Sequence, residues 1–145
     1  MKILKRNTLF LKETHRIKYI NEIAGADEMV NFKEVFSFLN TGKSGVNIPT
    51  SGVYYNQKSF RLDKLLEEEI KNIKKVFLKV DAEGHELIII QNAPILLNIT
   101  SYLLIEISKK NEIETCISIL KSYNFNKFIQ LNDDGPVIDL FAAKV

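Results

Sequence analysis

The chain of 145 residues lacks the features that would assign it to several specialised classes. A single cysteine, Cys116, excludes an intramolecular disulfide and is typical of a reducing compartment, so we expect a cytoplasmic protein. No stretch approaches the roughly 18 unbroken apolar residues of a membrane span, and no signal-peptide core follows the basic residues 1–6. The net charge of +2 is too small to indicate a nucleic acid or an anionic membrane as partner.

The composition that is present is that of an ordinary folded domain. Hydrophobic residues make up 46% and charged residues 26% of the sequence, and neither internal repeats nor low-complexity linkers divide it. We therefore predict a single domain over residues 1–145.

The stretch 76–86 changes character abruptly in its middle. The short apolar run 76–80 predicts a buried parallel strand, and an acidic turn with a glycine then leads into a helix over about 84–91. This layout is typical of a crevice in an open α/β sheet, where ligands bind outside the carboxyl ends of the strands, so Asp81 and Glu83 are expected to face the ligand. The alternative is that these acids only cap the next helix, but two carboxylates at one strand end are more than a cap requires.

The other strands follow from alternation and from short apolar runs. Alternation predicts a strand over 16–23, and an apolar run predicts a buried strand over 102–107. The apolar residues of 29–37 predict a second strand there, with a helix as the alternative. A tight turn between two short strands predicts a hairpin over 127–143. Residues 40–58 contain glycines and a proline without any apolar period, which predicts a loop that is either functional or disordered.

The remaining helices have recognisable starts. Apolar positions on one helical face predict a helix over 60–72 with Asp63 as its N-cap. Pro94 suits the first position of a short helix because it has no amide donor to lose. A last helix begins at Asn111 with a sequence like a capping box, and Cys116 lies on its apolar face as a core residue rather than a nucleophile.

Four segments of the sequence resemble the FkbM-type methyltransferases. Residues 78–86, LKVDAEGHE, are similar to the family signature K-x-D-x-E-G-x-E, and residues 60–66, FRLDKLL, are similar to its S-L-D-x-L-L segment. Residues 102–107 resemble the next strand of the family, which ends in a glutamate, and residues 139–144 resemble its closing strand. The resemblance implies a Rossmann-like class I methyltransferase fold, a mostly parallel α/β sheet with a C-terminal antiparallel hairpin, and S-adenosylmethionine (SAM) as cofactor.

One part of that family pattern is missing from the sequence. Class I enzymes hold the methionine part of SAM with a glycine-rich turn, and no Gly-x-Gly pattern follows a strand here. The start of the chain instead resembles the family just after its second strand. We therefore expect a domain incomplete at its N-terminus, in which the strands 16–23 and 76–80 expose edges that a partner chain or an oligomer would complete.

The strand ends and the resemblance together assign the site. Asp81 is the expected general base or metal ligand, and Glu83 and Glu106 come from adjacent strand ends and would share Mg²⁺ with it. His85 is a further candidate base, although its position after a glycine at a helix start is typical of a surface residue. The segment at the family position near the adenine contains two expected cofactor contacts, Gly25 and Ala26.

The resulting prediction is SAM-dependent methylation of a hydroxyl on a sugar, glycan or other small-molecule acceptor, by the C-terminal part of such an enzyme. The alternative is a non-catalytic remnant or interaction module that pairs through its exposed strand edges. The absent glycine turn favours this alternative, whereas the set of Asp81, Glu83 and Glu106 favours a working site. A magnesium-dependent phosphate-handling domain is a third reading of the carboxylates, but the sequence contains no phosphate loop.

Overall fold

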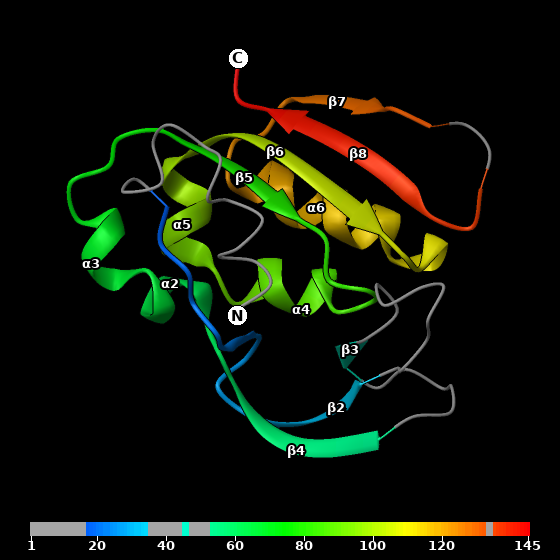
Figure 1. The fold of residues 1–145 in the computed structure, drawn as a ribbon. Coiled ribbons are helices and arrows are strands. Elements are labelled where there is room, and N and C mark those ends of the chain that lie inside the picture. Colours follow the sequence, from blue (N-terminus) through cyan, green and yellow to red (C-terminus); the bar gives the residue numbers. More distant parts are fainter. Residues whose placement is uncertain (1–16, 35–44, 47–52, 133–134) are drawn as a thin grey trace.

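The computed structural model describes residues 17–34, 45–46, 53–132 and 135–145, which form two four-stranded sheets with short helices (Figure 1). The first sheet contains, in spatial order, β1 (Ile23–Ala24), β4 (Val53–Phe60), β2 (Met29–Glu34) and β3 (Gly45–Val46). The second contains, in spatial order, β5 (Val76–Val80), β6 (Thr100–Ile107), β8 (Ile138–Ala143) and β7 (Lys127–Gln130).

The sheets are mixed, and most of their pairs are antiparallel. Parallel pairing is limited to β1 with β4 and β5 with β6 among the described strands. The other pairs, β2 with β3, β2 with β4, β6 with β8 and β7 with β8, are antiparallel. The prediction of an α/β fold and of a C-terminal antiparallel hairpin is confirmed. The prediction of a mostly parallel sheet is wrong, because each sheet contains only one parallel step.

The first sheet differs from the sequence prediction in two places. Of the strand predicted over 16–23, the described part is extended only at its end, in β1. The loop predicted over 40–58 contains most of β4, whose residues 53–58 are all exposed and therefore show no apolar period. Backbone pairing with β2 over six residue pairs makes this segment a strand. The strand predicted over 29–37 is confirmed as far as Glu34, and its last residues lie outside the described part.

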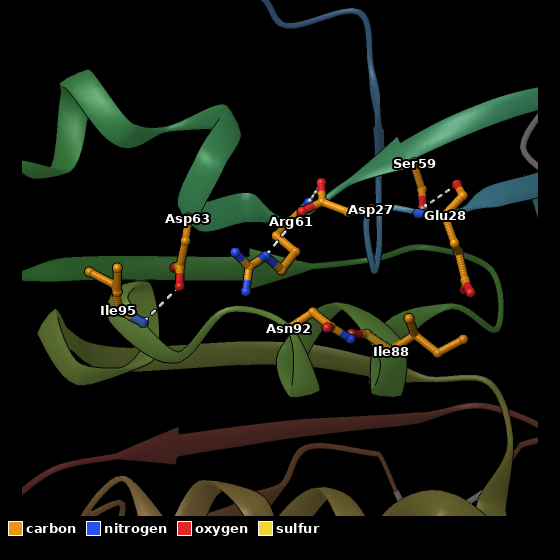
Figure 2. A network of polar contacts seen from close by, with 8 residues as sticks. All are labelled: Asp27, Glu28, Ser59, Arg61, Asp63, Ile88, Asn92 and Ile95. Carbon is orange, nitrogen blue, oxygen red and sulfur yellow. Dashed lines mark hydrogen bonds and ion pairs between the residues drawn. The ribbon is translucent and has the colours of Figure 1, made fainter.

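The helix predicted over 60–72 is broken into α2 (Leu62–Leu65) and α3 (Glu67–Ile70). The prediction that Asp63 caps its own helix is wrong, because Arg61 occupies the cap position. The carboxylate of Asp63 instead accepts hydrogen bonds from the amides of Ile95 (2.9 Å) and Leu96 (2.8 Å), in the first turn of α5 (Pro94–Ile99). Figure 2 shows Asp63 pointing from α2 toward α5. Pro94 at the start of α5 confirms its predicted role.

Most of the core lies between the second sheet and the helices α4 (Glu86–Gln91), α5 and α6 (Ile113–Ser122). Alternate residues of β6 point toward these helices, so Leu103, Ile105 and Ile107 are fully buried. Cys116 on α6 is buried, as predicted. The capping box predicted at Asn111 is wrong, because a 3₁₀ turn, η3 (Lys110–Glu112), precedes α6 and no side chain caps it.

The opposite face and the outer edge of the second sheet remain accessible. Phe77 on β5 is 61% exposed and Tyr102 on the neighbouring β6 is 48% exposed. Within the described residues, β5 pairs with β6 alone and stands at the end of the sheet. Among the described helices, none has the length and apolar character needed to cross a membrane.

Candidate functional site

The predicted acids gather where the neighbouring strands β5 and β6 end, and we call this end of the second sheet the acidic edge. Asp81 follows the last residue of β5, Glu83 lies in the next turn, and Glu106 is near the end of β6. One carboxylate oxygen from each of these residues lies within 4.8 Å of the other two. The parallel pairing of β5 with β6 explains this arrangement, because the carboxyl ends of parallel strands meet at the same edge.

The cluster is electrostatically strained around Glu106. Burial, together with the charges of Asp81, Asp139 and Glu83, raises the pKa of Glu106 above its usual value. Asp139 is the direct partner of Glu106 across the β6–β8 pair. Lys79 relieves part of the negative charge, since its Nζ lies 3.0 Å from Asp81 Oδ2, and this hydrogen bond raises the pKa of Lys79. A carboxylate with a raised pKa is a stronger base than an ordinary carboxylate.

The turn that carries Glu83 has an unusual backbone. Glu83 has a φ of 48° and Gly84 a φ of 93°, so two successive residues are left-handed. Glu86, the first residue of α4, is only 1% exposed, and its Oε1 accepts hydrogen bonds from the amides of Gly84 (2.8 Å) and Ala82 (3.2 Å). The turn is therefore closed around a buried carboxylate.

His85 is not the surface residue that its position predicted. It is 4% exposed, and burial lowers the pKa of its imidazole, which keeps the ring neutral at physiological pH. Its Nε2 is buried and has no hydrogen-bond partner within the part of the chain that the structure describes. A Cβ atom placed on Gly25 would lie 3.0 Å from this nitrogen and 2.7 Å from Ser59 Oγ. The two side chains thus pack directly against the backbone of Gly25, beside the hydrogen bond that Ser59 donates to the Glu28 carbonyl (Figure 2).

Two hollows lie close to these elements. A cavity of about 220 Å³ is next to the acidic edge and includes Asp81 in its wall. Its other lining residues are Ala24, Leu62, Lys79, Val80, Ala82 and Ile89. A larger hollow of about 760 Å³ lies over the first sheet. It is lined by Asn21, Glu22, Ile23, Phe32, Tyr55, Gln57, Lys58 and Phe60.

The described residues fit only part of a SAM molecule. The cavity beside Asp81, at about 220 Å³, is smaller than the roughly 300 Å³ at which pockets for small ligands begin, so it does not enclose a whole SAM molecule by itself. Ala24, rather than Gly25 or Ala26, contributes to its wall. The space next to the Gly25 backbone is already filled by Ser59 and His85.

Two residues of this region were missed by the sequence prediction. Glu86 belongs to the signature segment, but the sequence prediction gave it no role. An acid at the start of a helix is already explained by its favourable interaction with the helix dipole. Asp139 approaches Glu106 only through the register of β6 and β8. No sequence pattern indicates that register.

Comparison with known proteins gives one result that identifies a family. No curated protein and no solved structure matches the chain. The sequence profile of the methyltransferase FkbM domain matches residues 5–131, which is most of the 145 residues. The match includes Asp81, Glu83, Glu86 and Glu106. The chain therefore belongs to the FkbM methyltransferase domain family.

Proposed function

We propose that this chain carries the acceptor side of a SAM-dependent O-methyltransferase, whose substrate is a hydroxyl group of a sugar, a glycan or another small molecule. The observation that carries the proposal is the convergence of the carboxylates of Asp81, Glu83 and Glu106 within 4.8 Å, in a chain of a methyltransferase family. A hydroxyl becomes a good nucleophile when a nearby base removes its proton.

In this proposal Asp81 is the base, because it both borders the cavity and is exposed. Glu83 and Glu106 orient the hydroxyl or share a divalent cation with Asp81, and Mg²⁺ is the cation that hard carboxylate oxygens favour. His85 is a second candidate base, since a neutral imidazole accepts a proton. Gly25 and Ala26 are proposed to contact the adenine side of the cofactor. The buried free thiol of Cys116 supports a cytoplasmic location as part of the proposal.

We also propose that the outer edge of β5, which pairs with no other described strand, pairs with a strand from another chain. Four of the five residues of β5 are apolar, and one of them, Phe77, is 61% exposed. A strand with unpaired backbone groups and an exposed apolar side chain is a template for further pairing. Such a strand would extend the second sheet beside the acidic edge.

The test is calorimetric titration of the chain with SAM and with S-adenosylhomocysteine, with and without Mg²⁺, and with the molecular mass measured in the same sample. Methyl transfer is then measured with methyl-labelled SAM and a panel of sugar acceptors. We expect micromolar binding where the measured mass is that of an oligomer, which would complete the cofactor site. We also expect a transfer rate that Asp81→Asn lowers at least tenfold, while Glu68→Gln on the exposed face of α3 leaves it unchanged. A folded chain that neither binds the cofactor nor transfers a methyl group refutes the proposal for these residues.

A further inference from the structure

The carboxylate of Glu86 connects the two strand ends that carry the acidic cluster. Its Oε1 accepts hydrogen bonds from the amides of Ala82 (3.2 Å) and Gly84 (2.8 Å), in the turn after β5. The same oxygen accepts a hydrogen bond from the hydroxyl of Ser108 (3.3 Å), which directly follows β6. One buried atom is therefore bonded to the turn after each of two adjacent parallel strands.

The turn after β5 needs such a contact. A side-chain-bearing residue in the left-handed region, such as Glu83 with a φ of 48°, is strained and persists only when its surroundings hold it there. Amides that are partly shielded from water also need acceptors, and the amides on either side of Glu83 both bond to Glu86. The left-handed backbone at Glu83 and the buried carboxylate of Glu86 thus depend on each other.

The position of the cluster follows from this turn. Asp81 and Glu83 flank Ala82, whose amide is bonded to Glu86, and Glu106 lies two residues before Ser108. Displacing the turn from the end of β6 would separate Asp81 and Glu83 from Glu106. We propose that Glu86 is a positioning residue, whose buried carboxylate holds the turn 81–84 against the end of β6 and so sets the separation of the three carboxylates.

A purely structural role for Glu86 predicts different behaviour. As the first residue of α4, Glu86 would favour the helix through its charge alone, and its loss would lower stability without changing the turn. Its second oxygen, Oε2, is buried and has no hydrogen-bond partner among the described residues. Packing alone does not explain a buried acid with one unsatisfied oxygen, whereas the three bonds to Oε1 require an acceptor at this place.

The experiment compares three variants of the full chain by nuclear magnetic resonance. Glu86→Gln keeps an acceptor oxygen, Glu86→Asp keeps the charge but shortens the reach, and Glu86→Ala removes both. The readouts are the amide proton shift of Gly84, the backbone shifts that report φ at Glu83, and residual dipolar couplings of residues 81–84 relative to β6. Glu114→Ala, on an exposed position of α6, is the matched control.

We expect Glu86→Gln and the control to keep the wild-type turn, and Glu86→Asp and Glu86→Ala to lose the Gly84 amide shift and the left-handed signature of Glu83. If Glu86→Ala does not fold, Glu86→Asp decides the matter. A wild-type turn in Glu86→Asp, or in a folded Glu86→Ala, overturns the inference even where the melting temperature falls.

The role in catalysis rests on the proposed function and has its own readout. If the chain transfers methyl groups, we expect Glu86→Asp to lower kcat at least tenfold with little change in the KM for the cofactor. We expect the kcat of Glu86→Gln to stay within about threefold of the wild-type value. A change confined to KM contradicts positioning of the reacting groups. If the chain is inactive, the turn measurements still decide whether Glu86 sets the geometry of the cluster.

Discussion

Removing the carboxylate of Asp63 should destabilise the chain more than any exposed acid does. Asp63 is 8% exposed, and its carboxylate accepts hydrogen bonds from the amides of Ile95 and Leu96, the second and third residues of α5. Pro94 has no amide, and the amide of Leu97 bonds to the carbonyl of Ala93. The first turn of α5 is therefore fully satisfied, and Asp63, which lies 32 residues before Ile95, accepts two of its three amide hydrogen bonds.

The magnitude follows from the two bonds. Loss of an N-cap side chain costs about 1 kcal/mol and up to about 2 kcal/mol, and a buried amide left without an acceptor costs about 1–3 kcal/mol. We expect Asp63→Ala to lower the free energy of unfolding by about 3 kcal/mol. In a chain of this size that corresponds to a fall of about 10 °C in Tm. Asp63→Asn keeps one acceptor oxygen and should lose about half as much.

The assay is urea unfolding followed by circular dichroism, with thermal melts and hydrogen exchange of the Leu96 amide. Glu68→Ala is the control, because the Glu68–Lys71 ion pair on α3 is exposed and such pairs contribute less than about 1 kcal/mol. An unchanged slope with denaturant concentration confirms that the folded state alone has changed. If Asp63→Ala loses less than about 1 kcal/mol, or no more than the control, then the contact between α2 and α5 does not stabilise the fold as argued.

Three further measurements test other parts of the structure. Burial and neighbouring carboxylates raise the pKa of Glu106, so the folded state binds the proton of Glu106 more tightly than the unfolded state does. The proton therefore stabilises the folded state fully below the unfolded pKa, and this stabilisation is lost as the pH rises through the folded pKa. In thermal melts, Glu106→Gln should therefore gain stability relative to the wild type as the pH rises above the usual glutamate pKa of about 4.3, and a constant difference would contradict this. Burial raises the pKa of Cys116 to about 11, so the thiol should react with a thiol reagent at pH 8 only when denaturant is added; fast labelling of the native chain would be inconsistent with its burial. Gly25→Ala places a Cβ 2.7 Å from Ser59 and should lower the free energy of unfolding in urea by about 1–3 kcal/mol. Adding Ser59→Gly to the same chain should restore much of this loss, and a double variant as unstable as Gly25→Ala would disprove the steric cause.

The sequence predictions were most accurate for segments whose structure depends on their own residue types. Pro94 begins a helix because it has no amide donor, whatever lies around it. The strand at β5, the acidic turn after it and the buried β6 were recognised from short apolar runs and from residue types. The family was recognised on the same segments, and the match over residues 5–131 confirms it.

The predictions failed where the partner is distant in the sequence. Asp63 looks like a cap for its own helix, yet its carboxylate bonds the first turn of α5. Residues 53–58 of β4 are exposed on both faces, so pairing with β2, and not an apolar period, makes them a strand. His85 follows a glycine at a helix start, yet Gly25 and Ser59 from the first sheet cover it.

The candidate site shows the same division. The sequence by itself determined which acids are available, that two of them follow one strand, and that the chain belongs to a methyltransferase family. Only the tertiary structure brought Asp139 opposite Glu106 and connected the turn after β5 to the end of β6 through Glu86. The physical reason is that residue types and local periods act within a few positions along the chain. Register, burial and the hydrogen bonds of a buried carboxylate depend on segments that meet only when the sheet has formed.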